Sequence, residues 1–414
     1  MGSKKGNAIS YLTLIVVVLF ALCCCTPRLG FSIYLVPPVL LSFILIFNRY
    51  SSVHNNREGT LFLSVLLYLV VVIFYKLLGR SSVSPGELFQ HSIFFLLILM
   101  IPIISDIRNI SISRKIFWLS LGIVMLNIVY NIYLGIIMPE INLLSTVYFD
   151  TGYLVSINAG KSTFYTMSLF MFTILFFGYL NSEGKEKKIL LPCSLIVAIY
   201  VLFFCNKGTV VVYSLLSAVL LLAANRLKNK GRFYFMLVLM ALVAMLIVTE
   251  FKEPIIRFIV SISPSDRLSM RLVMLIDRDD VNASTSSFDG RTDLYMLSFN
   301  TWMASFKNFL FGIGDHRSWF DIEQTGIGQH SEFLDTAARY GLLGIVLITN
   351  IIIKTFKCIQ GYFGPKYKTQ LIAIFFITII CGLTKHLFIP DIAFPLFMML
   401  PLIKILLTNN TSKV

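Results

Sequence analysis

One short segment gathers four ionisable side chains at the start of a long apolar run. Residues 328–344 read GQHSEFLDTAARYGLLG, and IVLITNIII follows directly. Ser331 is a good helix N-cap, so we expect a helix to begin there and to run straight into the apolar segment. His330 stands just before that helix, where the positive end of the helix dipole disfavours a protonated imidazole. A neutral imidazole can take a proton from a hydroxyl group, so His330 is the candidate general base.

The other three ionisable residues of this segment are assigned supporting roles. Asp335 and Arg339 are four residues apart with the acid on the N-terminal side, which favours an ion pair on one helix face. Glu332 has no predicted helical partner, and the dipole of the first helical turn stabilises its carboxylate. We expect no metal at His330, because HSE lacks the HExxH spacing and no Cys or second nearby His completes a site.

Three further basic residues have positions that favour anion binding. Lys161, in NAGKST, stands at the N-terminus of a predicted helix, where free backbone N–H groups attract an anion; a lysine that only reaches the membrane surface explains it equally well. Lys207 is confined to the short turn CNKGT between two apolar runs. Arg291 falls in a first helical turn, where a cation needs an anionic partner. Its planar guanidinium suits a diphosphate, although Asp289 and Asp293 could neutralise it instead.

The composition of the chain indicates a membrane protein. Of its 414 residues, 57% are hydrophobic and 14% are charged, and the mean hydropathy is +0.81. This leaves too little polar surface to cover a soluble globule, and continuous apolar runs differ from the alternating pattern of barrel strands. The sequence therefore predicts an all-α integral membrane protein with about 12 transmembrane helices. The expected spans are 8–26, 30–48, 60–79, 88–105, 116–137, 159–180, 189–205, 209–224, 234–250, 332–353, 369–384 and 392–408.

The distribution of Lys and Arg predicts the orientation of these spans. Basic residues gather in alternate short loops, which places those loops and both termini in the cytoplasm. This placement accounts for the net charge of +14, so nucleic acid is not an expected partner. The predicted division is 1–250 with transmembrane helices 1–9, 251–329 as a large outer loop, and 330–414 with transmembrane helices 10–12. A connection as long as that loop is usually functional or disordered.

We expect one amphipathic helix at about 290–310 within the outer loop, lying at the membrane interface. Asp289 or Gly290 would cap its start, and the GIG sequence at 312–314 would end it. The apolar residues at helical spacing are Leu294, Leu297, Trp302, Phe306 and Phe309.

Three motifs follow one another late in this chain of many spans: GRTDLY, then GIG, then HSEFLDTAARYGLLG. This order resembles the O-antigen polymerase and O-antigen ligase superfamily. The likeness is specific over 290–344 and rests on topology elsewhere. It implies a fold like that of the C-type glycosyltransferases and a site at the periplasmic face of a bacterial inner membrane. It also implies a glycosyltransferase that uses an oligosaccharide linked to undecaprenyl diphosphate, within membrane lipid and without a metal ion or other cofactor.

The form HSEFLDTAARYG is more similar to the Wzy-type polymerases of that superfamily. The resemblance implies a polymerase that transfers the growing glycan from undecaprenyl diphosphate onto an incoming lipid-linked repeat unit. His330 matches the essential histidine and Arg291 one of the loop arginines, which makes both catalytic candidates. Lys207, Lys161 and Arg291 would hold the diphosphate. Lys207 departs from the Ser-Arg-Gly turn of many members, because lysine keeps the charge but loses the bidentate fork.

Two alternative functions remain open. An O-antigen ligase, which transfers finished glycan to lipid A-core, shares nearly every feature. A flippase for lipid-linked oligosaccharides is expected to show paired halves and charges along the middle of its spans, whereas the charges here collect at the outer ends. A polysaccharide chain-length regulator is a further candidate partner.

Overall fold

The computed structural model describes most of the helical part of the chain. The described residues are 2–25, 31–50, 56–81, 85–107, 109–137, 162–205, 208–227, 231, 233, 289–315, 325–329, 331–385 and 387–408. Every named element among them is a helix, which confirms the all-α class.

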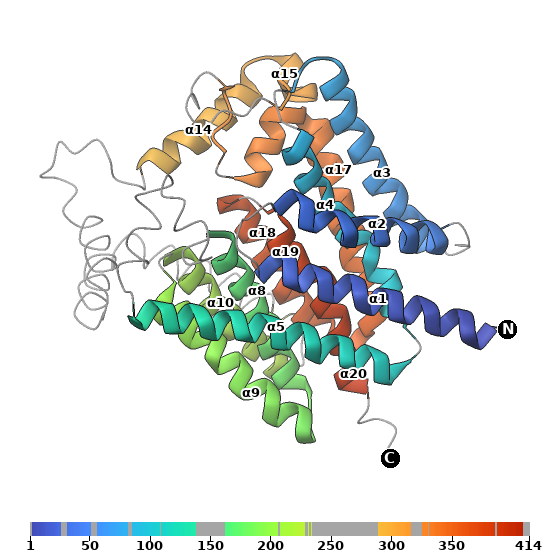
Figure 1. The fold of residues 1–414 in the computed structure, drawn as a ribbon. Helices are drawn as coiled ribbons and strands as arrows, with labels where there is room; N and C mark the ends of the chain where they lie inside the picture. The colour runs from blue at the N-terminus through green and yellow to red at the C-terminus, as the bar shows by residue number, and fades with distance from the viewer. Residues whose placement is uncertain are drawn as a thin grey trace, which may run out of the picture.

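The helices follow one another along the chain from the blue to the red end of the colour bar (Figure 1). They are α1 (Gly2–Cys25), α2 (Phe31–Tyr50), α3 (Asn56–Leu77), α4 (Pro85–Ser105), α5 (Ile110–Ile137), α8 (Ser162–Asn181), α9 (Gly184–Ile199), the π-helical η1 (Tyr200–Phe204), α10 (Gly208–Arg226), α14 (Asp289–Met303), α15 (Phe306–Phe311), α17 (Glu332–Phe363), the 3-10 turn η2 (Pro365–Tyr367), α18 (Lys368–Thr384), α19 (Pro390–Ala393), the π-helical η3 (Phe394–Met399) and α20 (Leu400–Thr408).

Nine helical segments of the described chain are long and apolar enough to cross a membrane. They are Ala8–Cys25, Glu58–Leu77, Ile110–Ile137, Phe164–Asn181, Gly184–Phe204, Thr209–Arg226, Glu332–Phe363, Pro365–Thr384 and Pro390–Leu407. Two shorter apolar helices, Val36–Tyr50 and His91–Ser105, match two more of the expected spans. The expected span at 234–250 lies outside the described residues. The chain is therefore a multi-pass membrane protein.

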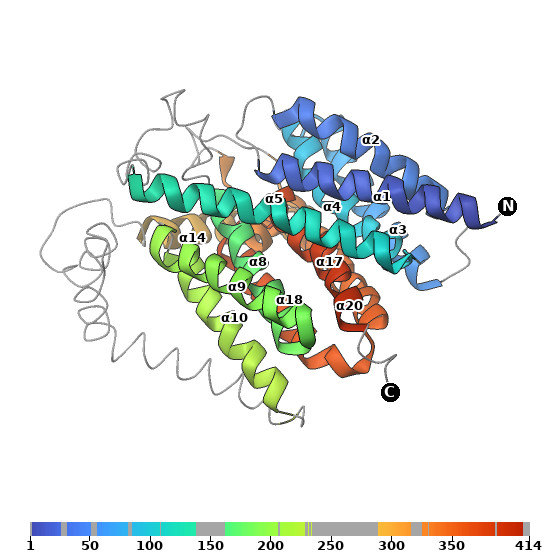
Figure 2. The ribbon, with the colours of Figure 1, turned by 60° about the horizontal axis from the view of Figure 1, so that its bottom comes forward.

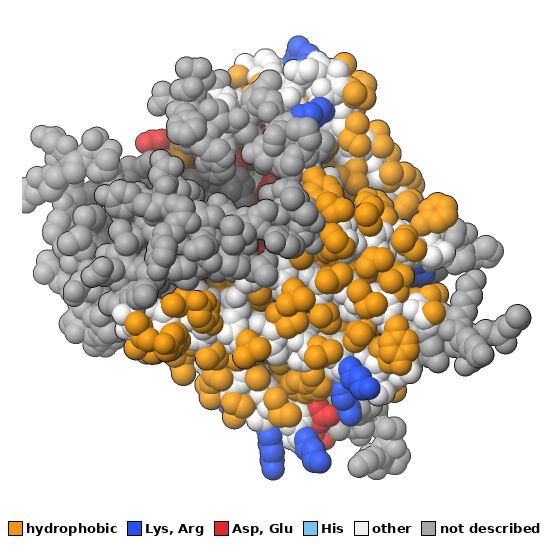
Figure 3. All heavy atoms as spheres, viewed as in Figure 1, with side chains coloured by type: hydrophobic (Ala, Val, Ile, Leu, Met, Phe, Trp, Pro, Cys, Tyr) orange, Lys and Arg blue, Asp and Glu red, His pale blue; other side chains and the backbone are white. Residues whose placement is uncertain are grey.

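Large apolar side chains cover the outside of this bundle. Phe47 is 77% exposed, Leu77 80% and Leu126 73%. Figure 3 shows hydrophobic side chains across the face formed by α1, α3 and α5, with Lys and Arg side chains at its lower edge. Such a surface would be unfavourable in water but suits contact with acyl chains, because the helices satisfy their backbone polar groups internally.

One helical segment, made of α19, η3 and α20, runs through the middle of the bundle. Of its span Pro390–Leu407, 94% is buried. It contacts α4, α5 and α8, and Figure 2 shows α5 running alongside α1, with which it packs, while α5 also contacts α9. A helix that is apolar on all sides is expected where neighbours surround it.

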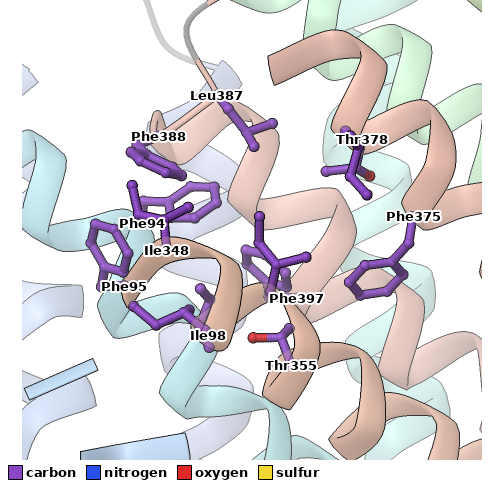
Figure 4. Close-up of a pocket in the computed structure, with 13 residues that line it drawn as sticks. Phe94, Phe95, Ile98, Ile348, Thr355, Phe375, Thr378, Leu387, Phe388 and Phe397 are labelled. Carbon is purple, nitrogen blue, oxygen red and sulfur yellow. The ribbon is translucent and has the colours of Figure 1, made fainter. Parts of the chain in front are cut away.

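A small apolar cavity lies between this central segment and helices α4, α17 and α18. Figure 4 shows aromatic rings around it, with the hydroxyl groups of Thr355 and Thr378 on its rim. The ring and branched side chains that line it include Phe94, Phe95, Ile348, Phe375, Phe388 and Phe397.

The two ends of the bundle differ. α1 begins and α20 ends on the side away from α14 and α15 (Figure 1). We call the side with α14 and α15 the α14 end. At the opposite end, Arg49 forms ion pairs with Glu58 (3.0 Å) and Asp106 (2.8 Å), which tie α2, α3 and α4 together.

The single helix expected at 290–310 is in fact two helices, α14 and α15. Ser305 has an extended backbone (φ −156°, ψ 158°), and its side chain accepts a hydrogen bond from the Asn308 N–H. That serine therefore ends the first helix and caps the second, which the apolar spacing alone does not reveal. The predicted end is confirmed, because Gly312 terminates α15 with φ +67°. Position at a membrane interface stays a prediction.

Helix α17 begins as expected but does not run straight. Ser331 is its N-cap, and the serine side chain accepts a hydrogen bond from the Leu334 N–H. Gly341 interrupts the helix with φ +63° and ψ −156°. The kink separates a short N-terminal part, which carries the ionisable residues, from the long apolar part that spans the membrane.

Candidate active site

The GIG segment at 312–314 packs directly against the kink in α17. The Ile313 N–H donates to the Ala338 carbonyl and the Gly314 N–H to the Arg339 carbonyl, each at 2.9 Å. Both carbonyls lie in the turn before the kink, where the helical hydrogen-bond ladder is interrupted. The GIG segment therefore supplies donors to carbonyls that the kinked helix leaves open.

Glycine is required at this junction because the two backbones touch. A Cβ added at Gly312 would lie 2.3 Å from the Arg339 carbonyl oxygen. A Cβ at Gly341 would lie 2.4 Å from the Leu310 carbonyl carbon. Both glycines also have positive φ, which other L-residues adopt at a cost. Two of the three motifs that carried the family resemblance, GIG and HSEFLDTAARYGLLG, thus form one packed unit.

The guanidinium of Arg339 lies buried in this unit between two carboxylates. Its Nε lies 3.0 Å from Oδ1 of Asp315 and its Nη1 lies 3.6 Å from Oε1 of Glu332. Only 2% of the Arg339 side chain is exposed. Such burial costs several kcal/mol per ion unless partners compensate each charge. The arrangement therefore holds the first turns of α17 against the residue that follows GIG.

The predicted pairing of Asp335 with Arg339 is not a direct contact, although the Asp335 carboxylate lies near enough to attract the guanidinium. Among the described residues, the ion pairs of Arg339 are with Asp315 and Glu332, and the Asp335 carboxylate accepts hydrogen bonds elsewhere. The helical spacing of four residues brought the two side chains to one face, but it could not foresee that the GIG segment delivers Asp315.

Glu332 connects the start of α17 to the loop between α18 and α19. Its Oε2 accepts hydrogen bonds from the backbone N–H groups of Leu387 (3.0 Å) and Phe388 (3.3 Å). Its own N–H donates to the carbonyl of Lys385 at 3.3 Å. The side chain that had no assigned partner in the sequence is thus a buried link between two segments and a partner of Arg339.

Asp335 and Ser298 hold the turn that precedes α17. The Ser298 hydroxyl donates to Oδ1 of Asp335 (2.7 Å) and accepts from the Gly328 N–H (2.8 Å). Oδ2 of Asp335 accepts from the Ser331 N–H at 3.3 Å. Among the described residues, Gln329 is the one residue other than glycine with positive φ, at +56°. A left-handed glutamine costs about 1–2 kcal/mol, so these bonds hold a strained turn in place.

The structure describes only part of the predicted catalytic and diphosphate-binding residues. His330, Lys207 and Lys161 lie outside the described residues. Arg291 belongs to the first turn of α14, although its side chain is not described. The structure does bring together the three predicted supporting residues Glu332, Asp335 and Arg339, at the turns that directly follow position 330.

The helices next to those predicted cations converge at Thr384, the last residue of α18. The hydroxyl of Tyr213, in α10, lies 2.8 Å from the Thr384 hydroxyl. The hydroxyl of Tyr295, in α14, donates to the Thr384 carbonyl at 3.4 Å. α10 begins next to Lys207, and Arg291 lies in the first turn of α14. Both helices therefore begin at the end of the bundle where α17 also begins.

Two residues of this junction, Asp315 and Ser298, were not predicted from the sequence. Asp315 also accepts a hydrogen bond from the Tyr340 hydroxyl (3.4 Å). The signal for Asp315 was its position directly after GIG, and the signal for Ser298 was its spacing of two helical turns from Arg291.

The segment that follows α3, at Arg80 and Ser81, is tied to the same junction. The Asp315 N–H donates to the Arg80 carbonyl at 2.9 Å, and Ser81 and Asp315 form a parallel bridge. The Tyr75 hydroxyl donates to the Phe311 carbonyl. The end of α3 is therefore part of the wall of this site.

Within the described ranges, no three His, Cys, Asp or Glu side chains are grouped so that they could hold a metal ion. The three acids of the junction are engaged by Arg339, by the Ser298 hydroxyl and by backbone N–H groups. What the arrangement offers is a rigid polar junction that holds α14, the 328–331 turn and the loop after α18 in a common geometry.

A comparison with protein families finds one matching model, described as O-antigen ligase, over residues 193–349. The match confirms the resemblance to the O-antigen polymerase and ligase superfamily and includes α10, α14, GIG and the N-terminal half of α17. It does not distinguish the polymerases from the ligases. No curated protein matches the chain.

Proposed function

Because residues 193–349 carry a domain of the O-antigen ligase family, we propose that this chain is an O-antigen polymerase. It transfers the growing glycan from undecaprenyl diphosphate onto an incoming lipid-linked repeat unit. The observation that carries the proposal is the junction at the α14 end. There α14, which contains Arg291, is bonded through buried groups to Gly328 and Asp335. Helix α10, which follows Lys207, is linked to α14 through part-buried contacts at Thr384.

In the proposed reaction, the acceptor hydroxyl oxygen forms a bond to the anomeric carbon of the donor glycan. The bond from that carbon to the phosphate oxygen breaks, and its electron pair leaves with undecaprenyl diphosphate. His330 takes the hydroxyl proton as general base. Arg291 and Lys207, with Lys161, neutralise the charge that develops on the leaving diphosphate, which stabilises the transition state.

The described residues of the junction have a positioning role in this proposal. Arg339 with Asp315 and Glu332 holds GIG and the loop after α18 against the start of α17. These contacts are buried, so water does not compete with them. Catalysis requires a fixed distance between the general base and the cations that neutralise the leaving diphosphate, and such a rigid frame helps to maintain that distance.

We propose that the α14 end faces the periplasm and that both termini lie in the cytoplasm of a bacterial inner membrane. The support is the distribution of basic residues. Arg49 and Arg114 lie at the end of the bundle opposite the α14 end, where Arg114 forms an ion pair with Glu186 at 3.2 Å. Lys and Arg side chains on short connections are enriched on the cytoplasmic side of membrane proteins.

The main competing function is O-antigen ligation to lipid A-core, which the description of the matching family favours. The polymerase is favoured by the form HSEFLDTAARYG. The lipopolysaccharide of a deletion strain separates the two. Loss of a polymerase leaves single repeat units attached to the core, whereas loss of a ligase leaves the core without repeat units.

The site is tested by complementing that strain with variants at equal protein levels. His330→Ala and Arg291→Ala should fail to restore the glycan ladder, while Lys307→Ala, at an exposed position of α15, should restore it in full. A full ladder from His330→Ala would contradict the assignment of the general base. A wild-type ladder in the deletion strain itself would contradict both polymerase and ligase.

A further inference from the structure

The hydroxyl of Ser298 is completely buried between α14 and the turn at 328–331, and both of its hydrogen-bonding functions are used. It accepts from the Gly328 N–H at 2.8 Å and donates to Oδ1 of Asp335 at 2.7 Å. A hydroxyl that both accepts and donates within a buried site is more strongly oriented than one that makes a single bond.

The same carboxylate holds the other end of the turn. Oδ2 of Asp335 accepts from the Ser331 N–H at 3.3 Å. The backbone N–H groups of Gly328 and Ser331 are thus attached to one carboxylate, the first through the Ser298 hydroxyl and the second directly. Between these two attachments lie Gln329, with φ +56°, and position 330. The turn is therefore restrained on both sides.

Ser298 also shares a helix with Arg291. The two positions are seven residues apart in α14 (Asp289–Met303), which is about two helical turns, so they lie on the same helix face about 10 Å apart along the axis. The backbone of Leu294, halfway between them, lies so close to the turn that a Cβ at Gly328 would be 2.0 Å from its carbonyl oxygen. Helix α14 and the turn therefore touch along this face.

We propose that Ser298 is a positioning residue, which acts through Asp335 to set the spacing between α14 and the turn at 328–331. This proposal rests on the proposed function for the roles of Arg291 and His330. Loss of the hydroxyl would release the Gly328 N–H and let the turn shift relative to α14. A misplacement of about 1 Å between reacting groups can lower a rate about 100-fold.

The test compares Ser298→Ala with Ser298→Thr, which keeps the hydroxyl, and with the control Thr336→Val. Thr336 is a neighbouring buried residue of α17 whose hydroxyl has no hydrogen-bond partner among the described residues. Each purified variant is assayed for glycan transfer from a lipid diphosphate-linked repeat unit. Amide hydrogen exchange is measured on the peptide that covers 325–331.

We expect Ser298→Ala to lower kcat by about 10- to 100-fold, with KM changed by less than about threefold and with faster exchange in that peptide. Ser298→Thr should recover most of the lost kcat, and Thr336→Val should keep the wild-type kcat. In a double-mutant cycle, Asp335→Asn added to Ser298→Ala should lower kcat no further than the larger single effect, because both act in one relay.

A wild-type kcat for Ser298→Ala overturns the proposal, and so does an equal loss in Thr336→Val, which would indicate a general packing effect. Unchanged exchange at 325–331 in Ser298→Ala overturns the restraint itself. Failure of the proposed function is recognised separately. If His330→Ala keeps wild-type turnover, the base is misassigned, while the exchange data still decide whether Ser298 restrains the turn.

Discussion

The buried charge of Arg339 provides the most direct test of how this site is held together. Replacement by leucine removes the cation and leaves the carboxylates of Asp315 and Glu332 buried without it. At an effective dielectric constant of ~20, the gross attraction is about 5.5 kcal/mol at 3.0 Å from Asp315 and about 4.6 kcal/mol at 3.6 Å from Glu332. Desolvation offsets part of this, and removing one partner of a buried pair costs about 3–5 kcal/mol net.

The assay is the apparent melting temperature of detergent-solubilised protein, followed by the fraction that stays monodisperse after heating. Arg339→Leu should give a large decrease, and Arg339→Lys a smaller one, because lysine keeps the charge without the planar fork. Adding Asp315→Asn to Arg339→Leu should recover part of the loss, since it removes one of the uncompensated charges.

A double-mutant cycle decides whether the partner is Asp315 or Asp335. We expect a coupling of about 2–3 kcal/mol between Arg339 and Asp315, and a smaller coupling between Arg339 and Asp335, whose carboxylate attracts the guanidinium without forming a direct ion pair. A coupling that is larger for Asp335 would refute the geometry of the site and restore the helical pair expected from spacing. A stable Arg339→Leu variant would refute the buried-charge argument itself.

Three further predictions concern stability and use the same melting assay. Glu332→Ala should destabilise the protein by about 2–6 kcal/mol, because the buried N–H groups of Leu387 and Phe388 each lose an acceptor worth about 1–3 kcal/mol; Glu332→Gln, which keeps an acceptor oxygen, should lose clearly less, and equal losses would contradict this role. Thr355→Val should stabilise by about 1 kcal/mol, because the Thr355 hydroxyl is buried at the cavity of Figure 4 with no partner among the described residues; Thr378→Val should not, because that hydroxyl donates to the Ile374 carbonyl. Gly341→Ala should destabilise by at least about 2 kcal/mol through its positive φ and the contact with Leu310, whereas Gly122→Ala, in an open position of α5, should stabilise by up to about 1 kcal/mol; equal effects of the two substitutions would show that the kink is not needed.

Much of the architecture could be predicted because it depends on local properties of the chain. Hydropathy over about 20 residues identifies a membrane span without knowledge of its neighbours, and the nine spans and two shorter helices match the expected positions. Ser331 as a helix cap and Gly312 as a helix end follow from the backbone preferences of those residue types. The family resemblance also lay in contiguous motifs, so it needed no structure.

The partners within the site depend on contacts between segments that are distant in sequence. Helical spacing favoured Asp335 as the partner of Arg339, but the GIG segment inserts at the Gly341 kink and brings Asp315 to the guanidinium instead. Asp335 is then engaged by Ser298, a residue of another helix.

The sequence by itself therefore determined the membrane class, the spans and the residue types able to do chemistry, since each of these is a property of a short stretch of chain. Only the tertiary structure decided which buried charge meets which partner. That choice depends on the close backbone approach that Gly312 and Gly341 permit. Burial then makes each pairing specific, because an ion or N–H group left without its partner inside the bundle costs several kcal/mol.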